Sequence, residues 1–214
     1  MVKRKRLPPA AHRENDPVSS PHRCMYHHVS FDKKTWERIQ KSVDSKREFG
    51  GNLIFDKTNK LLSIKRHSEV HGEYDNVVIP HAGYEFHTHP AHCNNGICAL
   101  GIPSVADIII HLEDVNSKTL SHMIFERAGM WIMIPSLRLR GKSNKKHLED
   151  AFKQVQDMYK LVYSGVNMKR ARKGKTEQLR DDWLNAARNA GIHMRFIPKR
   201  VNNEAPHFSV PVKC

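Results

Sequence analysis

The chain has 214 residues, with 36 Lys and Arg against 22 Asp and Glu, which gives a formal charge of +14 at pH 7. The hydrophobic fraction of 39% is low for a wholly globular chain, so we expect a packed domain with polar extensions. No apolar run reaches the length of a membrane span, and residues 1–25 lack the apolar core of a secretory signal. The four cysteines form no dense disulfide framework, which favours a reducing intracellular setting, cytoplasmic, nuclear or within a large particle.

Basic residues are concentrated in two runs, at residues 3–6 and 169–175. We expect residues 1–29 to form a basic, proline-containing N-terminal arm, residues 30–165 to form the domain, and residues 166–214 to form a basic C-terminal extension. Such runs suit a polyanion, an acidic protein surface or nuclear import, and a solvated tail has the same composition. Neither run contains aromatic residues, so neither offers a stacking platform for single-stranded nucleic acid.

The first half of the domain is predicted to begin with a helix and continue in strands. Trp36, Ile39 and Val43 recur at helical spacing, which predicts a helix over residues 32–46 with Ser30 as its N-cap. Alternating and β-branched segments then predict strands at residues 52–56, 61–66, 76–79 and 84–89. Residues 57–60 are predicted to form the turn between the first two of these strands.

The second half returns to helices and strands. Its predicted helices span residues 104–115, 143–165 and 176–191, and its predicted strands span residues 121–126, 130–134 and 192–197. Residues 199–214 are predicted to form an extended arm. This order predicts an α/β (α+β) domain in which helices pack against a mixed sheet.

Two histidines and one aspartate form a candidate metal site. His87 and His89 are two residues apart at the end of a predicted strand, so both imidazoles should project from one face before Pro90 ends the pairing. Asp107 follows at the start of a predicted helix. Zinc is usually four-coordinate, so three protein ligands would leave one position open for water, the arrangement of a catalytic site.

The pattern His87-x-His89-Pro90, followed by Ser104-x-x-Asp107, resembles the JAMM motif of MPN-domain metalloproteases. Glu48 and the following Gly51 and Leu53 are similar to the family's upstream Glu-x-x-Gly-x-Leu. The resemblance covers residues 30–136. It departs from the family in the longer spacing between the second histidine and the aspartate, with the extra residues in the loop around residues 92–98.

The resemblance implies an MPN-like fold and a zinc site made by His87, His89 and Asp107. It further implies that Glu48 is the general base and that Ser104 donates a hydrogen bond to the oxyanion of the tetrahedral intermediate. The implied reaction is hydrolysis of an amide or isopeptide bond, in this family typically the removal of ubiquitin or a ubiquitin-like tag from a lysine side chain.

Each piece of the motif also has a structural explanation. Ser104 and Asp107 have the spacing of a helix capping box, and Glu48 alone could be a solvated carboxylate. His122 and His111 are interpreted as ordinary strand and helix residues. Trp131 and Trp183 are predicted to be core residues.

The cysteines are open to two interpretations. His92, Cys93 and Cys98 could hold a second zinc, but no fourth ligand lies at a suitable spacing and Cys-x4-Cys is loose, which favours two thiols without a ligand role. We expect Cys24 and Cys214 to be surface thiols.

A second hypothesis belongs to another class of function. MPN domains also serve as scaffolds in large assemblies, and two extended arms suit a structural subunit, for example a minor capsid component, whose arms thread between neighbouring chains. A third hypothesis, nucleic-acid binding, depends on charge alone.

Overall fold

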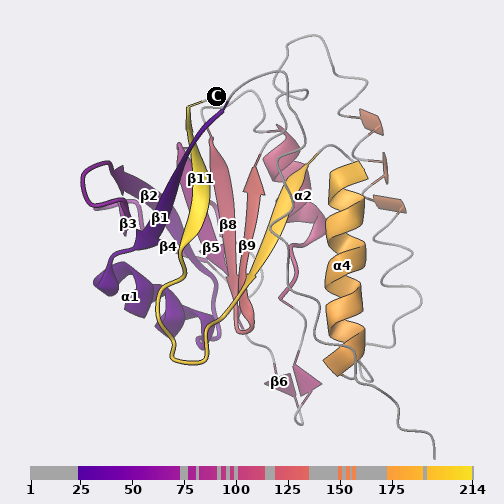
Figure 1. The fold of residues 1–214 in the computed structure, drawn as a ribbon. Helices are drawn as coiled ribbons and strands as arrows, with labels where there is room; N and C mark the ends of the chain where they lie inside the picture. The colour runs from indigo at the N-terminus through magenta and orange to yellow at the C-terminus, as the bar shows by residue number, and fades with distance from the viewer. Residues whose placement is uncertain are drawn as a thin grey trace, which may run out of the picture.

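A computed structural model gives the fold of the chain (Figure 1). The structure describes residues 24–72, 77–80, 82–90, 93–94, 97–98, 101–113, 119–134, 149–150, 153–154, 156–157, 173–189 and 192–213. The long helices are α1 (Lys33–Val43), α2 (Val105–Glu113) and α4 (Lys173–Asn189). The strands are β1 (Met25–Phe31), β2 (Phe49–Asp56), β3 (Leu61–Ile64), β4 (Val70–His71), β5 (Tyr84–Thr88), β6 (Cys93–Asn94), β7 (Ile97–Cys98), β8 (Ser121–Glu126), β9 (Gly129–Ile134), β10 (His193–Pro198) and β11 (Phe208–Lys213).

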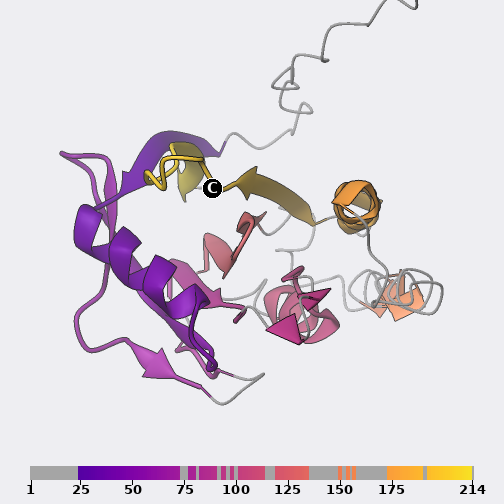
Figure 2. The ribbon, with the colours of Figure 1, turned by 90° about the horizontal axis from the view of Figure 1, so that it is seen from below.

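The main sheet is mixed, in the order β10-β9-β8-β5-β2-β3-β1-β11, and β4 pairs with the start of β2. The pairs β5–β8 and β1–β3 are parallel, and the other pairs are antiparallel. The sheet is curled (Figure 2), and Arg195 of β10 donates a hydrogen bond to the carbonyl oxygen of Ser209 on β11 at 2.7 Å. The predicted α+β class with a mixed sheet is therefore confirmed, and its likeness to the MPN fold stays a prediction.

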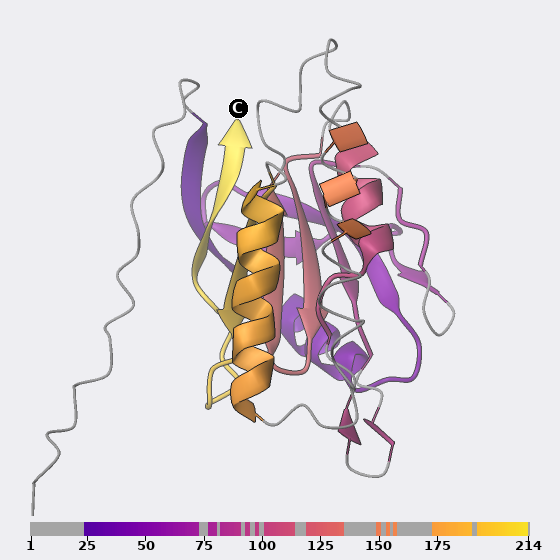
Figure 3. The same cartoon turned by 90° about the vertical axis from the view of Figure 1, so that its right-hand side faces the viewer.

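The two faces of the sheet carry separate cores, which explains why residues 123–125 of β8 and residues 130–134 of β9 are apolar at every position. On one face, the buried residues of these two strands pack with α1: Met123, Phe125, Met130, Ile132 and Ile134. On the other face, their buried residues pack with α2 and α4: Ile124, Trp131 and Met133. Because successive strand residues point to opposite faces, both faces can be apolar only when helices cover both. Figure 3 shows α2 and α4 along the second face.

The structure corrects the predicted start of the first helix. The N-cap is Asp32, whose side chain accepts a hydrogen bond from the Thr35 amide at 3.1 Å. Ser30 lies in β1 instead, and its hydroxyl donates to the carbonyl of Pro206 at 3.0 Å. Asp32 is the first residue beyond the strand, so the chain can turn into the helix only there.

Most other predicted elements are found within one to three residues of their expected bounds. One exception is the strand predicted at residues 76–79, because residues 77–79 form no strand and residue 76 lies outside the described part. The predicted helix at residues 143–165 lies largely outside the described residues, although positions 149–150, 153–154 and 156–157 are helical. The basic runs at residues 3–6 and 169–172 also lie outside it.

The C-terminal segment predicted to be an extended arm is partly sheet. β11 pairs along β1, with Met25 opposite Lys213. Cys24 is disulfide-bonded, which contradicts the prediction of a surface thiol there; Cys214 lies outside the described residues. Among the described helices, none combines the length and apolarity that crossing a membrane would require.

Candidate metal centre

The central strand β5 lies between β2 and β8, and it places His87 on the face of the sheet that α2 and α4 cover, beside the second of the two cores. His87 is buried and lies opposite Gly50 on β2 and Ile124 on β8. A side chain on Gly50 would meet the carbonyl oxygen of Phe86 at 2.9 Å, so glycine is what allows β2 and β5 to approach here. His89 follows just beyond the end of β5, where its amide still donates to the carbonyl of Phe125 at 2.8 Å.

The start of α2 supplies the carboxylate. Asp107 Oδ2 accepts hydrogen bonds from the amide of Ser104 at 2.6 Å and from its hydroxyl at 2.7 Å, and the Asp107 amide donates back to Ser104 Oγ at 3.1 Å. This is the reciprocal pattern of a capping box, so the structural explanation of the Ser-x-x-Asp spacing holds. The same carboxylate also faces both histidines. The hydrogen bonds of the capping box therefore hold the Asp107 carboxylate in place next to His87 and His89.

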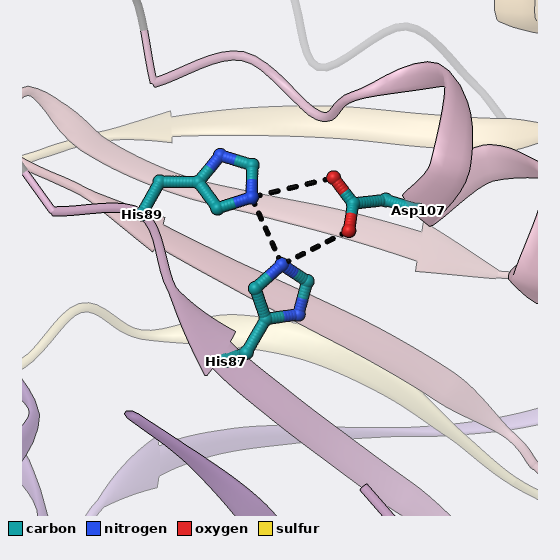
Figure 4. Close-up of side chains that lie close together, drawn as sticks. All are labelled: His87, His89 and Asp107. Carbon is teal, nitrogen blue, oxygen red and sulfur yellow. Dashed lines mark hydrogen bonds and ion pairs between the residues drawn. The ribbon is translucent and has the colours of Figure 1, made fainter. Parts of the chain in front are cut away.

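The three predicted ligands converge (Figure 4). His87 Nε2 lies 2.9 Å from His89 Nε2 and 3.1 Å from Asp107 Oδ1, and His89 Nε2 lies 3.3 Å from Asp107 Oδ2. Metal–ligand bonds of about 2.0–2.1 Å at tetrahedral angles put ligand atoms roughly 3.3 Å apart. The donor spacing therefore fits an ion at the centre of this group, which could hold a metal.

Burial and charge set different protonation states for the two histidines. Burial lowers the pKa of His87 to about 4, although the charge of Asp107 works in the opposite direction. Burial also opposes the charged form of His89, but Asp107 and, more weakly, Glu48 raise its pKa above the ordinary value. The pKa of the Asp107 carboxyl is held well below its usual range, because the two imidazoles outweigh its burial. The metal-free centre thus has a neutral His87, a protonated His89 and an ionised Asp107 in mildly acidic solution.

Glu48 lies beside the ligands without belonging to them. It precedes β2, it is buried, and its Oε1 lies 4.0 Å from His89 Nε2. The entry to β2 is anchored to the metal-site strand, because the Phe49 amide donates to Thr88 Oγ1 at 3.1 Å. All five predicted site residues, Glu48, His87, His89, Ser104 and Asp107, are therefore neighbours, although the geometry assigns no role to Glu48 or Ser104 by itself.

Two residues behind the site were not predicted from the sequence to belong to it. His122 Nε2 lies 2.8 Å from His87 Nδ1, and His122 Nδ1 lies 3.3 Å from Glu85 Oε2. The interpretation of His122 as an ordinary strand residue is thus incomplete. Glu85 had a signal in the sequence, since it precedes His87 by two and shares its strand face. His122 had none, since only the parallel register of β5 and β8 places it opposite Glu85.

The segment inserted before α2 forms a separate small ribbon. β6 and β7 pair with each other, with Cys93 opposite Cys98. His92 lies outside the described residues. The side chains of Cys93 and Cys98 also lie outside the described part, so the second zinc site stays a prediction.

Comparison with models of protein families, with curated proteins and with solved structures finds no match to this chain.

Proposed function

We propose that the chain is a zinc-dependent hydrolase of amide or isopeptide bonds, similar in its site to the JAMM metalloproteases. The observation that carries the proposal is the convergence of two imidazole nitrogens and a carboxylate at 2.9–3.3 Å, with a second carboxylate 4.0 Å from His89. Two nitrogen ligands and one oxygen ligand suit zinc, and three protein ligands leave a position for water or substrate.

The chemistry divides between the ion and the chain. A bound zinc would lower the pKa of a bound water to roughly 7 and polarise a substrate carbonyl. His87, His89 and Asp107 would hold the ion, and their fixed positions on β5 and α2 would set its open face. Glu48 would accept a proton from the attacking water and pass it to the leaving amine, because its carboxylate is adjacent to the ligands without being one of them.

Ser104 would act on the oxygen of the reacting carbonyl. Its hydroxyl now donates to Asp107 Oδ2 at 2.7 Å. Rotation about the Cβ–Oγ bond would turn the same proton toward substrate, where it would stabilise the developing oxyanion. The amide of Ser104 would continue to hold Asp107 at 2.6 Å, so the ligand would keep its position during that rotation.

Metal analysis followed by a turnover assay tests the proposal. Purified protein should contain about one zinc, and His87→Ala should lose it. A ubiquitin-amine reporter should be cleaved, cleavage should stop with a chelator, and Glu48→Gln should retain zinc while turnover falls by about 10²–10⁴-fold. Glu37→Gln is the matched control, because Glu37 is exposed on α1 and pairs with Lys33 at 3.9 Å. Absence of zinc, or unchanged turnover in Glu48→Gln, contradicts the proposal.

The substrate class follows from the resemblance, which implies a lysine-linked ubiquitin-like tag. The alternative, a structural subunit with two threading arms, loses part of its basis because residues 208–213 pair with β1 of the same chain. Protein that binds stoichiometric zinc but is completely inactive against tagged substrates would favour the structural-subunit hypothesis instead.

A further inference from the structure

The segment that leads into α2 lies against the end of β8, beside the candidate metal centre. His89 Nε2 faces His87 Nε2 at 2.9 Å and Asp107 Oδ2 at 3.3 Å. The same ring also donates a hydrogen bond to the backbone carbonyl of Gly101. Ile102, the next residue, is buried in the second core, so the core holds this part of the backbone in place.

Gly101 has no room for a side chain. A Cβ built on it would overlap the Cβ of Glu126 and would lie 2.7 Å from Glu126 Oε2, and the three nearest atoms all belong to that one side chain. The φ angle of Gly101 lies outside the left-handed region, so glycine is needed here for space and not for the conformation of the backbone. The backbone of Gly101 therefore rests directly on the Glu126 side chain.

The Glu126 side chain is itself held from two directions. Its Oε1 accepts hydrogen bonds from Trp131 Nε1 at 3.2 Å and from Arg180 of α4 at 3.1 Å. The Arg180 guanidinium also lies over the ring of Phe196, 4.3 Å from its centroid. Glu126 is buried, and a buried carboxylate cannot turn away from these donors without leaving a charge unpaired. The surface on which Gly101 rests is therefore rigid, and α4 contributes to it.

We propose that Gly101 and Glu126 act as positioning residues for the candidate metal centre. Glu126 supports the backbone of Gly101, and the Gly101 carbonyl holds the His89 ring with Nε2 directed at the other two ligands. A backbone carbonyl that contacts a metal-binding histidine commonly fixes the orientation of the ring and influences metal affinity. The resemblance to the MPN family implies neither residue, and Arg180 lies beyond the residues that it covers. The expected change in zinc affinity rests on the proposed function, but the packing of Gly101 against Glu126 does not.

A methyl group at residue 101 should disturb the centre only while the Glu126 side chain is present. In Gly101→Ala the added Cβ must move the segment away from β8, and the carbonyl moves away from His89 with it. Zinc affinity, measured by competition with a chelator, should therefore fall by about 10–100-fold. In the Glu126→Gly background the three nearest atoms are absent, so adding Gly101→Ala should change zinc affinity by less than about twofold.

Gly83→Ala is the matched control. Gly83 lies just before β5, and the nearest atom to a Cβ built on it is Leu120 Cδ1 at 3.9 Å, which is an ordinary contact. This variant should therefore bind zinc as the wild-type protein does. The comparison of backgrounds separates positioning from stability, because Glu126→Gly lowers the stability of the fold further. A loss of zinc affinity caused by instability would persist in that background, whereas a loss caused by the steric overlap disappears there.

Crystal structures complete the test and distinguish it from the test of the hydrolase. A wild-type structure in which the Gly101 carbonyl does not reach the His89 ring overturns the positioning role, and this measurement needs no variant to fold. Unchanged zinc affinity in Gly101→Ala, or an equal loss in both backgrounds, overturns it as well. Protein that binds no zinc contradicts the hydrolase, and metal-free Gly101→Ala then decides the positioning role. The distance between the Nε2 atoms of His87 and His89 should exceed 2.9 Å in that variant, and an unchanged distance overturns the role.

Discussion

The proton on His89 predicts a measurable signature of metal binding. Burial opposes that charge, but Asp107 and Glu48 raise the pKa of His89. Burial holds the pKa of His87 at about 4, and the Asp107 carboxyl is ionised far below neutrality. At about pH 6, below the ordinary histidine pKa, the three ligands therefore carry one removable proton between them, and it is on His89.

Zinc binds neutral imidazole, so its binding at this pH should release about one proton. Below the pKa of His89, the dissociation constant for zinc should fall about tenfold for each unit by which the pH is raised, because one proton competes with one ion. Above that pKa, the dissociation constant should level off. Each tenfold step corresponds to about 1.4 kcal/mol of binding free energy. A zinc-bound water with a pKa of roughly 7 keeps most of its protons at pH 6 and so adds little to the count.

Isothermal titration calorimetry in two buffers with different ionisation enthalpies counts the protons. Glu48→Gln keeps all three ligands but removes one of the charges that raise the pKa of His89. In this variant, the pH at which proton release drops to half should move downward. Release near zero in wild-type protein at pH 6 would show that His89 is neutral, and release near two would show that His87 is also protonated. Either result would refute this account of the electrostatics.

Three further predictions concern the framework. Trp183→Ala should lower the free energy of unfolding by about 3–5 kcal/mol, because its fully buried ring joins α4 to the second core; a loss below about 1 kcal/mol in urea unfolding would contradict this packing. Gly50→Ala should lower the free energy of unfolding by about 1–3 kcal/mol and weaken zinc binding, since the added Cβ would lie 2.9 Å from a backbone oxygen of β5. Unchanged zinc affinity in this variant would contradict the close approach of β2 and β5. Reduction of the Cys24 disulfide should lower the free energy of unfolding by about 2–5 kcal/mol. We expect its partner to be Cys214, which follows Lys213, the register partner of Met25, in the sequence. Peptide mapping of the oxidised protein identifies the partner, and any other cysteine would contradict this assignment.

Local patterns were sufficient to predict the strands and helices at the centre of the fold. Residues 121–126 and 130–134, which flank Ala128 and Gly129, were predicted as the strands that form β8 and β9, and helical spacing around Trp183 predicted α4. Predictions failed where distant segments decide the structure. Ser30 was a plausible cap by composition, yet β1 extends through it because β11 and β3 pair with that segment. Hydrogen bonds to a strand nearly 180 residues away leave no local mark in the sequence.

The three candidate metal ligands could be predicted from the sequence, and their supporting residues could not. His87 and His89 share a strand face by periodicity alone, and Asp107 is fixed by the helix it caps. Glu85 and His122 join them only through the parallel pairing of β5 with β8. Parallel partners are always separated by a crossover connection, so their register has no turn sequence to indicate it.

The distribution of polar residues between the two faces of the sheet argues that the centre serves function. On the first face, β5 contributes Tyr84 and Phe86 to an apolar core. On the opposite face the same strand buries Glu85 and His87, where apolar residues would stabilise the fold more. Natural sequences keep such locally unfavourable choices chiefly at functional sites. A cation would compensate the burial, because the two imidazole nitrogens and the carboxylate oxygens that lie 2.9–3.3 Å from one another could all coordinate it.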